Sequence, residues 1–227
     1  MRKIAFADIH GCNRSFGSLL DQVAPVEGDE FYFLGDYIDR GPDTKGVIDE
    51  IWKLEQEGFS VKCLKGNHEE MLLEGVSDDQ SHAMWFANGG EAVLKNFDIQ
   101  HVLDIPPAYL NWLKNLEYYL EVDEYILVHA GLNFDTPTPL DSQQSMLWIR
   151  SWYENINCDW LGDRIIIHGH TPIAKGAIVE QLQQIDDHQY LDIDAGCVHK
   201  NKRPWLGNLC AFDMTNRRLY FQENIDF

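Results

Sequence analysis

The segment FYFLGDYIDRG, residues 31–41, runs from an apolar stretch into a glycine turn that carries two aspartates and an arginine. Four other segments likewise end an apolar run with metal-type ligands, and these are ADIHG (7–11), GNHE (66–69), VHAG (128–131) and IIHGH (166–170). The carboxyl ends of strands in an open α/β sheet gather ligands at one edge, so segments far apart in sequence can converge there. The pattern predicts one composite site at a sheet edge.

The order of the apolar runs predicts an α/β fold. Strands are expected over residues 3–7, 30–34 and 60–64, with helices over 14–23 and 44–57 between them, which is a βαβαβ arrangement with a parallel sheet. Later β-type runs cover residues 125–128, 164–167, 190–193, 209–213 and 219–222. The turn-rich last third predicts an antiparallel second sheet.

The middle of the chain reads as helical. Helices are expected over residues 69–75, 82–97 and, after two prolines, 108–120. Together they predict a small helical cap, about residues 69–121, inserted in a single domain over 1–227, because no repeat, low-complexity tract or linker divides the chain.

Composition limits the function classes. The chain has 227 residues and a formal net charge of -19, so it should repel nucleic acid and anionic membranes, and any phosphate must meet a local positive centre. Five cysteines without a CxxC pair predict neither a disulfide framework nor a thiolate zinc site. The N-terminal run reads as a first strand and not a signal peptide, and we expect a soluble cytoplasmic protein.

The residue types at the strand ends suit a two-metal hydrolytic site. Asp36 is the candidate bridge between two ions, which in such sites lie roughly 3.5–4 Å apart and can hold an attacking hydroxide. The other expected ligands are Asp8, His10 and His170 for one ion, and Asn67, His129 and His168 for its neighbour. This mixed nitrogen and oxygen set suits manganese, iron or zinc better than calcium.

Three further residues are expected to act on the phosphoryl group. His68 follows Asn67 directly and points elsewhere, so we predict that it lies outside the metal shell as the general acid for the leaving oxygen. Asp39 is its expected partner, and Arg40 offers a planar fork for phosphate. Each motif alone has an ordinary structural explanation, such as a helix cap for GNHE, but five that jointly complete one site favour the metal hypothesis.

The motifs D-x-H-G, G-D-x-x-D-R-G, G-N-H-E, H-A-G and G-H-T resemble those of calcineurin-like metallophosphoesterases of the PPP type. Ala7 departs from the pattern, because many members carry glycine there. The resemblance extends from Asp8 to Thr171, and DIDAG (192–196) is similar to a further family element. It implies a central β-sandwich of two mixed sheets flanked by helices, a four-layer αββα fold, with a dinuclear centre that often carries Mn2+.

The segments WFANGGEAVL (85–94) and HAGLNFDTPTPLDSQQSMLWIR (129–150) resemble small bacterial and phage serine/threonine protein phosphatases. In that group the arginine of W-x-R is a second phosphate ligand, a position that Arg150 matches. We therefore expect a phosphoprotein or a small phosphoester as substrate, and hydrolysis without a phosphoenzyme. We expect no nucleic acid or membrane partner.

Two alternatives stay open. A symmetrical diadenosine tetraphosphate hydrolase shares every metal motif, because substrate choice lies in the cap and in the loops after His129. A phosphatase fold without catalysis, acting as a binding protein, is the alternative of another class, and the complete ligand set counts against it. Nothing in the sequence demands more than a monomer.

Overall fold

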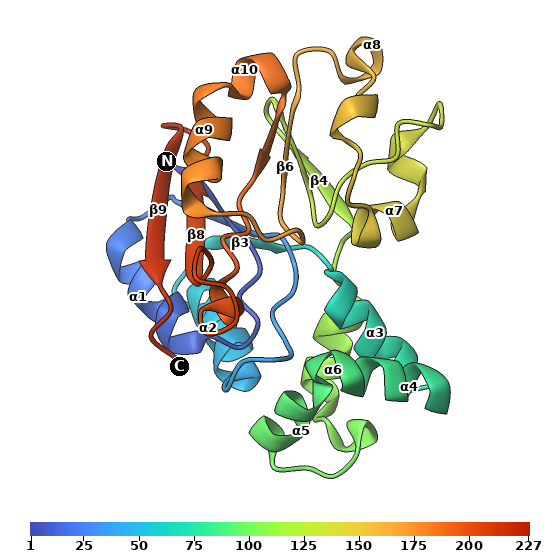
Figure 1. The fold of residues 1–227 in the computed structure, drawn as a ribbon. Helices are drawn as coiled ribbons and strands as arrows, with labels where there is room; N and C mark the ends of the chain where they lie inside the picture. Colours follow the sequence, from blue (N-terminus) through green and yellow to red (C-terminus); the bar gives the residue numbers. More distant parts are fainter.

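The computed structural model describes all residues, 1–227, and contains two β-sheets (Figure 1). The strand order is β3-β2-β1-β8-β9 in the first sheet and β4-β5-β6-β7 in the second. The strands are β1 (Lys3–Phe6), β2 (Glu30–Phe33), β3 (Ser60–Cys63), β4 (Tyr119–Val122), β5 (Tyr125–Val128), β6 (Ile165–His168), β7 (Tyr190–Asp192), β8 (Asn208–Asp213) and β9 (Arg218–Glu223). The predicted fold class, two mixed sheets flanked by helices, is confirmed.

Most helices lie on the outer faces of the sheets or in a separate group between β3 and β4 (Figure 1). The last two α-helices instead pack into the core between the sheets through Ile178 and Ile185. The α-helices are α1 (Asn13–Val23), α2 (Thr44–Gln56), α3 (Asn67–Gly75), α4 (Asp79–Trp85), α5 (Glu91–Phe97), α6 (Pro107–Lys114), α7 (Gln143–Trp148), α8 (Cys158–Leu161), α9 (Lys175–Gln183) and α10 (Ile185–His188). None of them combines the length and apolar character that a bilayer crossing needs.

The predicted βαβαβ unit is confirmed. Strand β1 pairs in parallel with β2, and β2 pairs in parallel with β3, with α1 and α2 as the crossovers. Helix α1 forms because Phe16, Leu19, Leu20 and Val23 recur at helical spacing and are buried together. Asp43 caps the N-terminus of helix α2, since its side chain accepts a hydrogen bond from the backbone N–H of Gly46.

Side chains along β1 point alternately to the two faces of the first sheet, and each face packs against a different layer of the fold. Ile4 and Phe6 belong to the core under α1 and α2, whereas Ala5 and Ala7 face the core shared with the second sheet. On β5, Leu127 packs into that same shared core. The two sheets therefore pack face to face, and each covers its outer face with helices or loops.

The prediction of a separate antiparallel sheet from the last third was wrong. Strands β6 and β7 continue the second sheet in parallel to β5, while β8 pairs antiparallel with β1 and leads to β9. Strand β1 is buried on both faces, so its second edge must also be hydrogen-bonded, and β8 supplies that partner.

Two helix predictions in the middle segment were also wrong. The helix expected over residues 108–120 ends at Lys114, and β4 follows, because Tyr119–Val122 pairs with β5. The helix expected over 82–97 is interrupted at Phe86–Gly90, where Gly89 has a φ of 116°. The predicted cap range, about 69–121, thus contains α3 to α6 but also most of β4, and its status as an insertion in one domain stays a prediction.

All five ligand segments follow the carboxyl ends of strands. Those strands are β1, β2 and β3 of the first sheet and β5 and β6 of the second. The helical group α3 to α6 lies next to this edge (Figure 1). The fold therefore brings loops from both sheets to one place, as the sequence predicts.

Candidate metal centre

A small polar pocket of about 80 Å3 marks the place where the strand-end loops meet. Five of the predicted ligands line it, namely Asp8, His10, Asp36, Asn67 and His170. His129 is fully buried and does not line the pocket. Its Nε2 lies 3.0 Å from the side-chain oxygen of Asn67, which does. Polar residues dominate the lining, which suits a charged ligand and not an apolar one.

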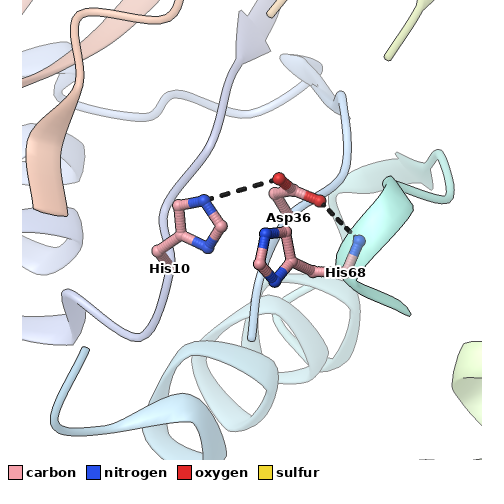
Figure 2. A group of neighbouring side chains, drawn as sticks. All are labelled: His10, Asp36 and His68. Atoms are coloured by element: carbon pink, nitrogen blue, oxygen red, sulfur yellow. Dashed lines mark hydrogen bonds and ion pairs between the residues drawn. The ribbon is translucent and has the colours of Figure 1, made fainter. Parts of the chain in front are cut away.

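Asp36 stands between two groups of histidines. One carboxylate oxygen lies 3.4 Å from His10 Nε2, and the other lies 3.6 Å from His129 Nε2 (Figure 2 shows the His10 side). The second oxygen also accepts a hydrogen bond from the backbone N–H of His68. Asp36 is therefore the residue that faces both halves of the site, as a bridging ligand would.

The ligand atoms divide into two groups around Asp36. His10 and His68 form one group with it, and His129 and His170 form the other, with all ligand atoms in a group within 4.8 Å of one another. The oxygen of Asn67 joins the second group, 2.9 Å from His170 Nδ1. His170 thus lies with His129, whereas the sequence had placed it with Asp8 and His10, although its backbone N–H does donate to the Asp8 carboxylate.

The structure does not bring His168 to this cluster. Its ring packs against Trp152, and its Nε2 lies 3.3 Å from the hydroxyl of Tyr153. His170 is only two residues away, but it has a φ of 68°, so the turn at Gly169 redirects its side chain into the pocket. We therefore leave His168 out of the ligand set that we propose.

Backbone geometry holds the ligands in place. His10, Asp36, Asp39, Arg40 and His170 all have positive φ, an uncommon conformation that non-glycine residues keep where surrounding structure enforces it. The buried carboxylate of Glu69 supplies part of that enforcement. It accepts hydrogen bonds from the backbone N–H groups of Asp36, Tyr37 and Gly66, and so ties the turn after β2 to the start of α3.

Two glycines leave room for the carboxylates. A Cβ at Gly66 would lie 2.2 Å from an Asp36 oxygen, and a Cβ at Gly169 would lie 2.2 Å from an Asp8 oxygen. Both distances are far below van der Waals contact, so a larger residue at either position would displace a candidate ligand.

The protonation of the cluster is set mainly by burial. Burial, followed by repulsion from neighbouring carboxylates, raises the pKa of Asp8 and Asp36 well above the ordinary range. Burial lowers the pKa of His129 to about 3 and, with the adjacent His129, lowers the pKa of His170 to about 2. The imidazoles are thus neutral, which is the form in which histidine binds a metal.

These residues fit two divalent cations. His170 Nε2 is buried without a hydrogen-bond partner, and the carboxylates of Asp8 and Asp36 are buried close enough to repel each other. A cation would satisfy the unpaired nitrogen and would offset the repulsion between the carboxylates. The mixture of imidazole, carboxylate and amide ligands is typical of transition-metal sites.

His68 and Asp39 contact each other as the sequence predicts. His68 Nδ1 lies 2.6 Å from one Asp39 oxygen, and the other oxygen accepts a hydrogen bond from the Trp85 indole N–H. Asp39 is fully buried, so Trp85 and His68 together fix its orientation. Burial, followed by the charge of Arg40, lowers the pKa of His68, and burial raises the pKa of its partner Asp39.

Two arginines reach the same pocket. Arg40 Nη1 lies 2.6 Å from His10 Nε2, and Arg150 Nη1 contacts the side-chain oxygen of Thr171 at 3.3 Å. They come from the turn after β2 and from the segment after α7, so their charges enter from separate loops. In a chain of net charge -19, these two guanidinium groups offer an anion cationic contacts in a pocket that Asp8, Asp36 and Asp194 also line.

The sequence analysis did not include three residues of the site. Asp194 and His199 line the pocket, and Glu69 holds the turn described above. Burial raises the pKa of Asp194 to about 6, and burial together with Arg40 lowers the pKa of His199 to about 4. The DIDAG segment, which ends an apolar run like the other motifs, was the available signal for Asp194.

The contrast between His168 and His170 can be tested with a matched pair of variants. We expect His168→Phe to keep phosphoesterase activity within about threefold, because the ring contacts aromatic side chains and not the pocket. We expect His170→Phe to lose about 10³-fold, because an electrostatic group of the site is removed. Steady-state rates with p-nitrophenyl phosphate measure both, and equal losses in the two variants would return His168 to the ligand set.

The comparison with protein families agrees with this geometry. The profile of the family described as "Calcineurin-like phosphoesterase" matches residues 1–198. The chain therefore belongs to the calcineurin-like phosphoesterase family, and the resemblance stated from the motifs is confirmed.

Similar proteins carry two kinds of name. The chain is 32% identical over 135 residues to a symmetrical bis(5'-nucleosyl)-tetraphosphatase of Nitrosomonas europaea, a match that covers 58% of this chain and 45% of that protein. The chain spans about half the length of the curated relatives it matches.

Solved structures show the same fold. A candidate diadenosine tetraphosphatase aligns with a TM-score of 0.69 at 20% identity, covering 100% of this chain and 95% of that one. A protein serine/threonine phosphatase from Saccharomyces cerevisiae aligns with a TM-score of 0.70 at 14% identity, covering 100% and 81%. At these identities the structures support the fold and do not choose between the two activities.

Proposed function

We propose that this chain is a metal-dependent phosphohydrolase that cleaves dinucleoside polyphosphates, the alternative left open by the sequence. The observation that carries the phosphohydrolase part is the position of Asp36 between two groups of ligand atoms, in a pocket that two arginines also enter. The choice of substrate is supported by the names of the curated relatives, which are symmetrical bis(5'-nucleosyl)-tetraphosphatases.

The proposed ligands form two sets that share Asp36. One set adds Asp8 and His10, and the other adds Asn67, His129 and His170. Divalent ions held there, Mn2+ in the first instance and Fe or Zn as alternatives, would supply Lewis acidity toward phosphoryl oxygens and lower the pKa of a bound water.

The remaining residues bind the substrate and move a proton. Arg40 and Arg150 offer planar guanidinium groups to the phosphoryl oxygens, and their separate origins allow them to hold the phosphate from two sides. The contact of Nδ1 with Asp39 leaves His68 Nε2 free to donate a proton to the departing oxygen.

The reaction balances as a hydrolysis. A water oxygen adds to one central phosphorus of the dinucleoside tetraphosphate, and the bond from that phosphorus to the bridging oxygen breaks. The bridging oxygen leaves with the second nucleoside diphosphate and takes the proton that His68 donates. One water and one dinucleoside tetraphosphate thus yield two nucleoside diphosphates, and His68 regains its proton from the water.

Product analysis and metal removal test this proposal together. We expect the Mn2+-loaded protein to convert diadenosine tetraphosphate into ADP alone, and we expect exhaustive EDTA treatment to lower the rate by at least about 10³-fold, with recovery on adding Mn2+. Chromatography of the nucleotides measures both. Formation of ATP and AMP, or a rate that EDTA leaves unchanged, would contradict the proposal.

A serine/threonine protein phosphatase, the first prediction from the sequence, is the second candidate. Arg150 favours it, because this residue lies in the pocket at the position that the phosphatase motif assigns to a second phosphate ligand. A phosphomonoester could be held by Arg40 and Arg150 alone. Parallel assays on phosphopeptides and diadenosine tetraphosphate distinguish the two candidate functions. A higher kcat/KM on the phosphopeptides would favour the protein phosphatase.

A further inference from the structure

A second and larger hollow lies beside the metal pocket. Its volume is about 770 Å3, which is within the range of small-molecule sites. Arg40, Val198 and His199 line both the metal pocket and this hollow, so the two adjoin. We call it the cap groove, and the lining residues used below are Arg40, Phe86, Asn88, Lys95, His199 and Lys202.

One wall of the cap groove is the interruption between α4 and α5. The backbone N–H of Arg40 donates to the carbonyl of Gly89, and a Cβ at Gly89 would lie 2.7 Å from Arg40 Cγ. Glycine is needed here, because the close approach coincides with a φ of 116°. The interruption therefore packs directly on an arginine of the metal pocket and places Phe86 and Asn88 beside it.

The opposite wall comes from the segment after DIDAG. Val198 and His199 belong to the short 3-10 helix Cys197–His199, and Lys202 follows in the turn. The structure places Lys202 on the groove, so this basic turn faces the same space as the cap.

The charge of the groove contrasts with that of the chain. Three cations line it, Arg40, Lys95 and Lys202, against the single carboxylate of Glu91, which is paired with Lys95 at 2.7 Å. The whole chain carries -19. A hollow with an excess of positive charge on so acidic a protein favours an anionic occupant over a neutral or acidic protein surface.

An exposed aromatic ring adds a second chemical feature. Phe86 is 43% exposed and lines the groove, so its ring is accessible to an occupant. A flat ring beside cations is suited to a base with phosphates attached, because the base can stack on the ring while the cations bind the phosphate oxygens.

We propose that the cap groove binds one nucleoside of the substrate together with the phosphate next to it, with Phe86 stacking on the base and Lys202 binding that phosphate. This inference rests on the proposed function. In a symmetrical cut, only one phosphate separates the attacked phosphorus from the ribose on its own side, so a groove for that nucleoside must begin beside the metal pocket. The three shared lining residues meet that requirement.

Binding of ADP and of pyrophosphate to the Mn2+-loaded protein, measured by calorimetry, tests the proposal without turnover. We expect the wild type to bind ADP about tenfold more tightly than pyrophosphate, because base stacking is added. Phe86→Ala should remove that difference, Phe86→Tyr should keep it, and Lys202→Ala should weaken both ligands. Leu103→Ala and Lys53→Ala, at exposed positions outside the groove, are the matched controls.

Turnover separates the two proposals. Phe86→Ala should raise KM for diadenosine tetraphosphate about tenfold and should affect turnover of p-nitrophenyl phosphate much less, because that substrate is too small to reach along the groove. Equal binding of ADP and pyrophosphate by the wild type would overturn the groove assignment, even if the dinucleotide is cleaved. Phosphopeptide binding that depends on Phe86, without ADP binding, would overturn it as well and would assign the groove to a protein substrate.

Discussion

Replacement of Asp36 by asparagine is expected to lower kcat/KM by about 10³-fold or more, because the residue that faces both groups of ligand atoms loses its charge while its shape is kept. The same change should lower the number of divalent ions retained after dialysis. Steady-state kinetics on p-nitrophenyl phosphate and elemental analysis of the dialysed protein measure the two effects.

The folded state of the Asp36→Asn variant needs its own measurement. Asp36 is buried among carboxylates that raise its pKa, so loss of its charge should leave the metal-free protein at least as stable as the wild type. Thermal unfolding in EDTA tests this, with the exposed Asp21→Asn on α1 as control. Full activity of Asp36→Asn, or lost activity that coincides with unfolding, would contradict the assignment.

His68→Asn is expected to lower kcat by about 10²–10⁴-fold, because the proposed proton donor to the departing oxygen is removed. The loss should be small for p-nitrophenyl phosphate, whose leaving group needs little help, and large for an alkyl phosphate. This dependence on the leaving group distinguishes an acid from a metal ligand, since loss of a ligand would slow both substrates alike.

Asp39→Asn is the companion variant, because Asp39 contacts His68 at 2.6 Å and does not line the pocket. As a positioning residue it should reduce kcat less than His68→Asn and shift the pH profile, since the carboxylate no longer favours the protonated imidazole. The double variant should be no slower than His68→Asn alone. An additive loss, or the same loss with every leaving group, would show that the pair does not transfer the proton.

Much of the candidate site could be predicted because its residues lie just after strands. Asp8 and Asp36 follow β1 and β2, which are short and mostly buried strands, and Asn67 follows the more exposed β3. Local pattern is enough for such residues, because parallel strands place their carboxyl ends at one edge. The contact between His68 and Asp39 was also predictable, since both belong to turns at that edge.

Spacing could not predict that only one of His168 and His170 reaches the pocket. Residues two apart on a strand share a face, and this rule places both histidines on the same side. The strand ends at His168, however, and the positive φ of His170 turns its ring into the pocket. The φ angle of a residue just past a strand depends on its neighbours in space. For His170 one such neighbour is the Asp8 carboxylate, which accepts a hydrogen bond from its backbone N–H.

The cap groove and strand β4 could not be predicted from local sequence, because both form through contacts between residues far apart in the chain. The periodicity of residues 82–97 favours one helix, and only the packing of Gly89 on Arg40 and of Gly90 on Trp85 interrupts it. Residues 119–122 follow directly on a helical pattern, and their pairing with β5 makes them a strand. Tertiary contacts override local propensity in both places.

The central claim is that Asp36 joins two ligand sets that hold two divalent ions. Native mass spectrometry of the protein after dialysis against Mn2+ counts the ions on each chain directly. The account predicts two ions on the wild type and at most one on Asp36→Asn. A wild-type chain that retains no ion or only one at saturating Mn2+, while remaining folded, would contradict it.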